Sequence, residues 1–486
     1  MKRLLVVLLA VLPMMAMAQA TKSVVVRITV DKGGELADQI KMEEKFKIAE
    51  LEISGPLNGN DVKFLQQMVN RSKANDKMGE CLVKRLDLSG VTILEGMKLN
   101  ANELPANCFS GAKGLESITL PSSIISIPKN CFDGCTSLRE VYYTASVKRI
   151  ESGAFRYCEN LKEITLPSDI TTIENNTFYN CKHLGHIDLP ASVETIGDGA
   201  FEFCTELSGI SLKNVTKIGD SAFEGCSHLT AIEFDQLKEL DGDAFKDCTS
   251  LTTVRLEGSL SDIGSNAFHG CSQLTTINIP SSVKKIGSKA FKSCKKLKAI
   301  ELPEGLEKLG SHAFENCSSL RQMFIPNHVT SIGSSAFEDC TSLDTISIDC
   351  MIKEIDSDLF RGCSSLKVVT LPLTVKKIGD KAFDKCTSLV SVSIPVSVKA
   401  IGDEAFRDCS MLASIELPVA LEEIGSSAFS KCPSLRNVYI KATNPPSISK
   451  STFKDLKACT FWIPKGTRQL YEANKQWAKL SGVKEM

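Results

Sequence analysis

Hydrophobic and polar positions recur along this chain in a unit of about 23 residues. Residues 274–294 read LTTINIPSSVKKIGSKAFKSC and residues 297–317 read LKAIELPEGLEKLGSHAFENC, so the apolar letters persist while the polar letters change. A fixed period of this length predicts a stacked array in which each copy is one structural unit. Phenylalanine marks the period, in steps of 23 residues with two steps of 22 and one of 24, at Phe109, Phe132, Phe155, Phe178, Phe201, Phe223, Phe245, Phe268, Phe291, Phe314, Phe337, Phe360, Phe383, Phe406, Phe429 and Phe453.

The apolar letters of one unit predict two short extended segments. In the first copy quoted above, Ile277 and Ile279 alternate with polar residues, so they share one face of a strand. Pro280 ends that strand because it has no N–H to donate to a neighbouring ladder. Val283 and Ile286 then point inward from a second extended piece.

The end of the unit predicts a compact bend. Gly287 supplies the backbone freedom for the bend. Ala290 and Phe291 lie on a short helical or 3₁₀ turn, and Cys294 follows on the same face. One such coil cannot bury its apolar side alone, whereas stacked coils bury a continuous one.

The head L-x-x-I-x-L, the period and the sixteen copies together predict the fold class. We expect an α/β repeat solenoid, namely a right-handed leucine-rich-repeat coil array. Short strands should line one face and short helical or 3₁₀ turns the opposite face. Sixteen coils with strands ~4.8 Å apart give a strand face roughly 75 Å long.

Both ends of the array carry atypical sequence, as a solenoid needs in order to cover its open ends. We assign residues 21–100 to an N-terminal cap with irregular repeats, residues 101–456 to the regular array and residues 457–486 to a C-terminal cap. Both tryptophans fall in the C-terminal cap, where one bulky side chain can cover an open core.

Hydrophobic patterning predicts individual elements within these ends. The N-terminal part should hold a strand over 24–30, a helix over 35–46, and a helix that Asn60 or Asp61 caps and that runs to about residue 70. The C-terminal part should hold a strand over 460–463 and an amphipathic helix over 467–480.

Fourteen units carry cysteine three residues after phenylalanine. Metal ligation, a disulfide ladder and redox chemistry are functional alternatives to a buried small side chain that lines each coil. Stacked copies point successive Cβ–S bonds the same way, whereas a disulfide needs sulfurs that turn toward each other with a dihedral near ~90°. No C-x-x-C pair offers a zinc site. We therefore interpret the set as core: Cys135, Cys158, Cys181, Cys204, Cys226, Cys248, Cys271, Cys294, Cys317, Cys340, Cys363, Cys386, Cys409 and Cys432.

Two further cysteines leave an alternative open. Cys108 and Cys131 both occupy the alanine position of neighbouring coils, so they should be adjacent in space. In an exported protein a disulfide between them is possible. The same geometric objection favours two core substitutions instead.

The start of the chain predicts export. Residues 1–20 read as a secretory signal peptide, with Lys2 and Arg3 before the apolar run 4–12 and small residues near the cleavage point. That run is shorter than the ~20 residues that a membrane-spanning helix needs, and no later stretch is long and apolar enough. The mature protein should therefore be secreted, periplasmic or associated with the cell surface, without an integral membrane span.

Charge excludes two classes of partner. The chain holds 57 basic and 58 acidic residues, a formal net charge of −1. Removing residues 1–20 takes away two basic residues and leaves 55 against 58, or −3. This near-neutral balance has no electrostatic footprint for nucleic acid or for an anionic membrane.

The sequence carries no recognisable catalytic motif, so we predict a protein that is not an enzyme and has no catalytic residues, no metal and no cofactor. Its six histidines show no metal-ligand spacing. His186 and Asp188 should be neighbours on the strand face, which without a nucleophile or a metal is a surface pair. An enzyme with its site in an end unit and an envelope spacer without a ligand remain as alternatives.

The repeat motif I-x-I-P-x-S-V-x-x-I-G-x-x-A-F-x-x-C is similar to the BspA-like leucine-rich repeats of bacterial surface and secreted proteins. The resemblance covers residues ~48–456, nearly the whole mature chain. It implies a non-catalytic binding role, since some members of that family adhere to host matrix or plasma proteins or to other bacteria. It implies no particular binding residues.

The outward positions of the strands form the expected binding surface. Most of them are small and polar, but Tyr142, Phe324 and Tyr439 are aromatic. Interface energy concentrates in aromatic and arginine side chains that become buried. We therefore predict that a protein or glycan from a host or bacterial surface binds around these aromatics, with Glu140 beside the first and Gln322 beside the second.

Overall fold

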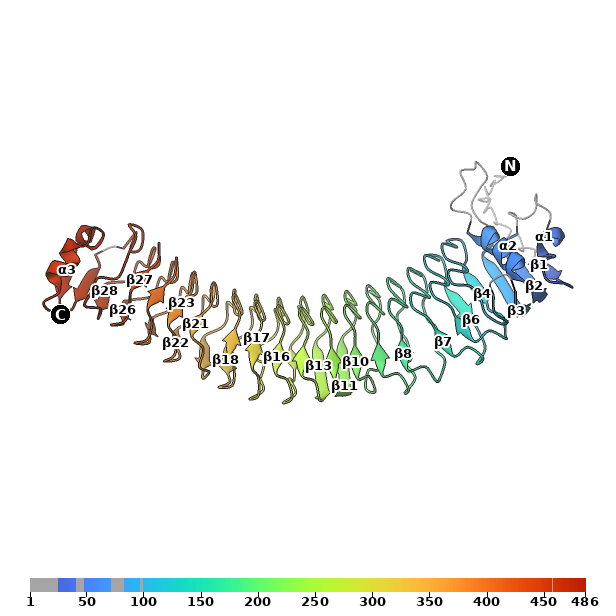
Figure 1. Ribbon diagram of the computed structural model, residues 1–486, viewed down its shortest axis with the longest axis horizontal. Helices are drawn as coiled ribbons and strands as arrows, with labels where there is room; N and C mark the ends of the chain where they lie inside the picture. Colours follow the sequence, from blue (N-terminus) through green and yellow to red (C-terminus); the bar gives the residue numbers. More distant parts are fainter. Residues whose placement is uncertain (1–24, 41–47, 71–82, 97–98, 457) are drawn as a thin grey trace, which may run out of the picture.

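The chain forms a long bowed solenoid whose two ends rise toward the same side (Figure 1). The computed structural model describes residues 25–40, 48–70, 83–96, 99–456 and 458–486. All pairings between named strands are parallel, and they confirm the predicted repeat array. The predicted signal peptide, residues 1–20, and Cys81 lie outside the described residues.

The first row of strands follows the L-x-x-I-x-L head of each unit, and we call its outer surface the strand face. Side chains alternate between buried and exposed along these strands, as the pattern predicts. The row consists of β1 (Val25–Thr29), β2 (Glu50–Leu57), β3 (Arg85–Ile93), β4 (Ser117–Thr119), β6 (Glu140–Tyr142), β11 (Ala231–Leu237), β13 (Thr253–Gly258), β15 (Thr276–Ile277), β18 (Gln322–Ile325), β20 (Thr345–Ile348), β22 (Val368–Thr370), β24 (Ser391–Ser393), β26 (Ser414–Leu417), β28 (Asn437–Ile440), β29 (Thr460–Ile463) and β30 (Val483–Glu485).

A second row of two-residue strands follows the V-x-x-I letters. The isoleucine or leucine of each pair points into the core. The row consists of β5 (Ser126–Ile127), β7 (Arg149–Ile150), β8 (Thr172–Ile173), β9 (Thr195–Ile196), β10 (Lys217–Ile218), β12 (Glu239–Leu240), β14 (Asp262–Ile263), β16 (Lys285–Ile286), β17 (Lys308–Leu309), β19 (Ser331–Ile332), β21 (Glu354–Ile355), β23 (Lys377–Ile378), β25 (Ala400–Ile401) and β27 (Glu423–Ile424).

The third side of each coil differs from the predicted helical or 3₁₀ turns, because residues 99–456 form no helix. Left-handed residues stand two places before and two places after the repeating phenylalanine, as Lys289 (φ 59°) and Ser293 (φ 62°) do around Phe291. A left-handed residue cannot continue a right-handed helix. Instead, the N–H of Phe291 donates to the carbonyl of Ala313 on the next coil at 2.8 Å. Equivalent bonds recur from Phe109 to Phe429, which gives the turn side its own row of inter-coil hydrogen bonds.

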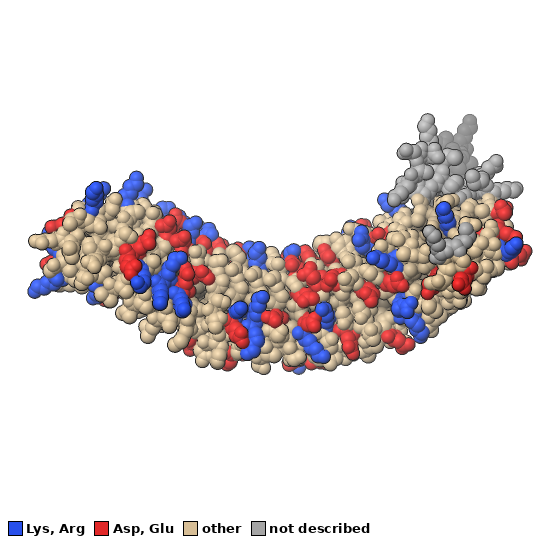
Figure 2. Space-filling model, viewed as in Figure 1, with Lys and Arg blue, Asp and Glu red and all other residues tan. Residues whose placement is uncertain are grey.

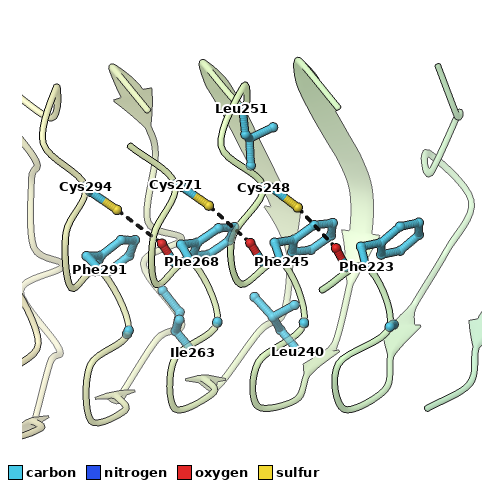
Figure 3. Packing of buried hydrophobic residues seen from close by; sticks show 14 of the residues in the cluster. Phe223, Leu240, Phe245, Cys248, Leu251, Ile263, Phe268, Cys271, Phe291 and Cys294 are labelled. Carbon is cyan, nitrogen blue, oxygen red and sulfur yellow. Dashed lines mark hydrogen bonds between the residues drawn. The ribbon is translucent and has the colours of Figure 1, made fainter. Parts of the chain in front are cut away.

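The core is a continuous ladder of stacked phenylalanine rings (Figure 3). Consecutive rings from Phe109 to Phe453 lie 5.1–5.8 Å apart and within 25° of parallel. The fourteen cysteines line this ladder as buried free thiols, and Cys108 and Cys131 are buried free thiols as well. The core interpretation of the cysteines is confirmed.

The repeating glycine has a different role from the one predicted. Gly287 does not adopt a positive φ, so it does not supply unusual backbone freedom. A Cβ atom on Gly287 would lie 2.6 Å from the backbone nitrogen of Ser265, and one on Gly310 would lie 2.5 Å from that of Ser288. Glycine is therefore needed because consecutive coils approach each other closely at this corner.

The described residues of the N-terminal end contain two helices, α1 (Leu36–Gln39) and α2 (Gly59–Val69). Only part of the helix expected over 35–46 can be compared: α1 ends at Gln39, Ile40 is extended, and residues 41–47 are not described. The prediction of an Asn60 or Asp61 cap was wrong by two or three residues. Asn58 caps α2, and Asp61 completes the capping box by accepting from the backbone N–H of Asn58 at 2.9 Å.

The C-terminal end confirms the strand predicted over 460–463, which is β29. The helix predicted over 467–480 is instead divided into α3 (Arg468–Ala473) and a 3₁₀ turn (Trp477–Lys479). Asn474 is extended between them, and its side chain accepts hydrogen bonds from the N–H groups of Gln476 and Trp477. Trp477 is buried and contacts the last ring of the phenylalanine ladder.

Candidate binding face

Two of the three predicted aromatics stand exposed on the strand face. Tyr142, in β6, is 53% exposed, and Phe324, in β18, is 46% exposed. These two residues are 182 positions apart, or about eight coils of 23, which at ~4.8 Å per coil separates them by roughly 40 Å. The structure therefore does not bring the predicted aromatics into one site, and each has its own neighbours.

Tyr142 is held in place by its predicted neighbour on the same strand. Its hydroxyl donates to a carboxylate oxygen of Glu140 at 3.1 Å, and this contact raises the pKa of Tyr142. The hydroxyl is therefore bound to an acidic group while the ring itself stays exposed. Glu140 is itself exposed, so the pair offers both an apolar surface and a negative charge.

The strand face is interrupted immediately after β6. No backbone hydrogen bond joins residues 163–166 to β6 or to residues 186–189, all of which the structure describes. Tyr143 occupies the inward position where other units have leucine or isoleucine, and its hydroxyl donates to the carbonyl of Thr165. That bond takes up an acceptor that a continuous ladder would use. The next strand of this row is β11, further along the array.

A hollow of about 590 Å³ lies over this interruption. Its apolar floor comes from three successive coils, and none of its fourteen lining residues is lysine or arginine. His186 and Asp188 are neighbours, as predicted, with 2.9 Å between the imidazole and carboxylate atoms. The hollow thus combines one aromatic ring with acidic and hydroxyl groups; its polar lining includes Glu140, Tyr142, Glu163, Thr165, His186 and Asp188.

The surroundings of Phe324 are simpler. Phe324 and Gln322 both point outward from β18, and the neighbouring positions on β20 are Ser347 and Thr345. The ring is therefore a single apolar contact among small hydroxyl-bearing residues. Such a surface offers one anchor and several hydrogen-bonding groups.

Tyr439, the third predicted aromatic, belongs to a pair that the sequence analysis missed. Its ring stacks on Trp462 in β29, with the centroids 6.3 Å apart and the planes 11° from parallel. Lys484 lies over the indole at 5.7 Å. The signal was present, because Trp462 stands one unit after Tyr439, but the prediction assigned both tryptophans to covering the core. Trp477 does so, whereas Trp462 lies on the strand face.

The turn side carries another aromatic group that sequence reasoning did not single out. Tyr157 and Tyr179 pack edge to face with centroids 5.1 Å apart, and Phe203 continues the group at 5.9 Å from Tyr179. The guanidinium of Arg156 lies over Tyr157. A period of 22 to 24 residues among these aromatics could have indicated the cluster.

The structure also gathers one histidine with two carboxylates, which the sequence spacing did not indicate. The ligand atoms of His312, Glu315 and Glu338 lie within 4.8 Å of one another. Both carboxylates are already compensated, since Lys292 contacts Glu315 at 2.8 Å and Arg361 contacts Glu338 at 2.6 Å. This charge balance makes the cluster an ion-pair network of the turn side rather than a cation site.

Charged side chains of both signs are interspersed along the visible face of the solenoid (Figure 2). This face therefore shows no patch of a single sign along its length. In the described parts, no helix has the length and apolar character that crossing a bilayer requires.

Parallel strands in rows, one coil per repeat, over a continuous apolar ladder define a leucine-rich-repeat solenoid. Residues 102–230, 238–367 and 353–473 match the BspA type leucine rich repeat region. The chain belongs to this BspA-type leucine-rich-repeat family.

Solved structures of bacterial leucine-rich-repeat proteins are similar to this chain. A leucine-rich repeat protein from Bacteroides ovatus is 26% identical, with 81% of this chain and 90% of that chain covered and a TM-score of 0.50. A leucine rich cell surface protein from Faecalibacterium prausnitzii is 26% identical, with 54% and 86% covered and a TM-score of 0.34. Among curated proteins, no match was found.

Proposed function

We propose that this protein is an exported, non-catalytic binding module that recognises a protein or a glycan through the hollow of its strand face. The observation that carries the proposal is the gathering of Tyr142 and three carboxylates over a break in the strand ladder. Membership of the BspA-type family supports a binding role, and the signal-peptide pattern of residues 1–20 supports export.

The lining of the hollow favours a partner that presents cations or hydrogen-bond donors. Glu140, Glu163 and Asp188 supply carboxylate oxygens as acceptors, and an exposed tyrosine ring attracts a lysine or arginine side chain through its π face. A rigid repeat scaffold holds these groups in fixed positions, so binding costs little ordering of the site. Both a basic segment of a surface protein and a hydroxyl-rich glycan satisfy this chemistry.

The test is to capture partners from host and bacterial surface extracts and from a glycan array with the full mature chain, and then to measure affinity with variants. A hot spot costs ~2 kcal/mol or more, so Tyr142→Ala should weaken binding roughly 30-fold. Glu163→Gln should also weaken the binding of a cationic partner. Tyr179→Ala is the matched control because this tyrosine lies on the turn side.

The variants also decide between parts of the surface. If Tyr142→Ala, Phe324→Ala and Tyr439→Ala each change the affinity by less than ~0.5 kcal/mol, the binding site lies on the turn side or along the edges of the solenoid. A loss confined to Phe324→Ala or Tyr439→Ala would move the site along the strand face. Either result would contradict the assignment to the hollow.

A further inference from the structure

Three consecutive coils near the C-terminal end carry exposed aliphatic side chains at one corner. Leu373, Val396 and Val419 each follow the proline that ends a strand, and they are 79%, 70% and 61% exposed. Other units have small or polar residues at this corner, for example Ser168 and Ser281. Successive coils lie ~4.8 Å apart, so the three aliphatic residues form one continuous stripe.

Charged residues border this stripe in an ordered way. The Leu373 coil continues into Lys376 and Lys377, whereas the Val419 coil continues into Glu422 and Glu423. All four side chains are exposed. The coil between them, which carries Val396, separates the basic pair from the acidic pair.

The strand register fixes this order along the solenoid. β23, β25 and β27 are successive parallel neighbours, in which Lys377 pairs with Ala400 and Ala400 pairs with Glu423. In the row of Lys377 and Glu423, the central coil therefore has the small residue Ala400 between the two opposite charges. In the adjoining row the order is Lys376, Lys399 and Glu422, so the two outer coils are basic and acidic and the central coil carries one lysine, which contacts Glu422 at 2.7 Å. Aliphatic residues lie beside all three coils.

Among the four charged residues that border the stripe, Lys376 and Glu423 have no ion-pair partner within the described residues. Lys377 contacts Glu354 at 2.7 Å, and Glu422 contacts Lys399 at 2.7 Å. Those two pairs are exposed, and exposed pairs contribute only ~0–1 kcal/mol each, so they can rearrange at low cost.

We propose that the stripe and its two charged borders form a contact surface for a second copy of this chain, related by a two-fold axis at Val396. A two-fold axis that lies in the interface at right angles to the solenoid axis reverses the order of the coils. Leu373 then faces the second copy's Val419, and Val396 faces itself. Lys376 and Lys377 face the second copy's Glu422 and Glu423, and the reverse holds on the other side of the axis. The two charged borders are therefore complementary to each other, which a two-fold interface requires, while the two copies of Lys399 meet at the axis, each beside its own Glu422.

The order of the charges favours a second copy over an anionic lipid surface. A lipid surface attracts basic residues and repels acidic ones, yet the acidic pair borders the same stripe as the basic pair. A self-complementary arrangement uses both. Three coils make a small contact, and small interfaces are weak, so we expect a dimer with a dissociation constant on the order of 10–100 μM.

Sedimentation equilibrium of the full mature chain, over about 1 to 300 μM, tests the inference across that range. Val396→Asp should abolish the dimer because it places a carboxylate at the centre of the contact. Ser281→Asp, the same change at the same corner of another coil, should leave association unchanged. A thermal melt of each variant shows that the fold is retained.

A charge exchange gives the sharper result. The double variants Lys376→Glu/Lys377→Glu and Glu422→Lys/Glu423→Lys should each weaken self-association at least tenfold. Mixing the two variants should restore association, because every glutamate pair then faces a lysine pair on the other chain. The wild-type chain should lose association as salt rises.

Three outcomes would overturn the inference. The wild-type chain remains monomeric at 300 μM, or the mixed variants associate no better than each one alone. The third is a monomer that binds vesicles containing anionic phosphatidylglycerol and loses that binding with Val396→Asp, which would assign the stripe to a lipid surface.

Discussion

The thiol of Cys294 donates a hydrogen bond of 3.2 Å to the backbone carbonyl of Phe268, one coil earlier (Figure 3). All fourteen ladder cysteines make this bond at 3.1–3.2 Å. A buried small side chain was the prediction, and the bond explains why that side chain is a thiol. In the first coil of the phenylalanine ladder, Ala112 stands where the later coils have cysteine. No ladder coil precedes it, so no ladder phenylalanine carbonyl is there to accept a thiol hydrogen bond.

The inter-coil thiol bond should contribute measurably to stability. Cys294→Ala removes a hydrogen bond and leaves a small cavity, so the free energy of unfolding should fall by ~1–2 kcal/mol. Denaturant unfolding measures this change. Cys459→Ala is the control, because Cys459 is partly exposed and, among the described residues, its thiol bonds only to the adjacent carbonyl of Thr460. Equal effects of the two substitutions would contradict the role of the bond.

The ladder thiols should be reduced and protected in the folded protein. Thiol counting in denaturant without reductant should find at least the fourteen ladder thiols, since all are free and buried. In the folded protein at pH 7.5 they should react slowly, because burial raises their pKa, to about 12 for Cys340. Cys459, which is partly exposed, should react before the ladder. A denatured count near zero would refute the core interpretation.

Stability should fall at alkaline pH. Burial raises the pKa of Cys135, Cys340 and Cys432 to about 12, whereas a thiol in the unfolded chain titrates near 9. The stabilising contribution of each neutral thiol is complete below pH 9 and is lost as the pH rises toward 12. Each thiol contributes a slope of up to ~1.4 kcal/mol per pH unit in that window.

Urea unfolding at pH 8 and pH 10 measures the slope. A variant with alanine at Cys294, Cys317 and Cys340 should show a shallower loss between the two pH values, which separates the thiols from the lysines and tyrosines that titrate in the same range. An unchanged slope would show that the ladder thiols do not set the alkaline limit.

The repeating glycine that follows the second row of strands, such as Gly310, should tolerate no side chain. Gly310→Ala places a Cβ atom 2.5 Å from the backbone nitrogen of Ser288, so the coils must separate and the free energy of unfolding should fall by ~1–3 kcal/mol or more. Gly305→Ala is the matched control on the same coil, since its Cβ would approach closely only the flexible end of Lys284, and the nearest backbone atom, the oxygen of Ser281, lies 3.8 Å away. A thermal melt compares them. Similar melting temperatures would mean that the coil spacing adjusts freely.

The C-terminal end should depend on a single tryptophan. Trp477 packs against Phe453, Phe461 and Tyr471, and its indole N–H donates to the carbonyl of Pro446 at 2.8 Å. Trp477→Ala should cost ~3–5 kcal/mol locally.

Amide hydrogen exchange should locate the loss of stability in the Trp477→Ala variant. Protection should fall over residues 425–486 and stay unchanged over residues 101–230, because each coil contacts only its neighbours. The control is Trp462→Ala, because Trp462 lies on the strand face and not against the core. It should leave amide hydrogen exchange in the phenylalanine ladder unchanged. Loss of protection along the whole chain would mean that the array unfolds as one unit.

The repeat, its inward positions and the character of the core followed from the sequence alone. Ile277, Phe291 and Cys294 are buried, and the apolar character of their positions recurs along the array, so each copy repeats the same evidence for burial. Helix-capping and hydrophobic-pattern rules were less reliable at the two ends of the chain, because the sequence there does not repeat and each element must be predicted from a single example. There the sequence misplaced the cap of α2 and extended one helix through Asn474.

The candidate site depended on contacts between coils that no single unit encodes. Tyr142 could be predicted as exposed, but the hollow beside it is lined by three successive coils, and next to it Tyr143 reaches the carbonyl of Thr165 on the next coil. The close approach at Gly287 and the thiol bond of Cys294 are likewise contacts to a neighbouring coil. Sequence periodicity determined which residues face inward, because burial depends on a residue's place within its own coil. The tertiary structure decided which groups meet, because that depends on how one coil is set against the next.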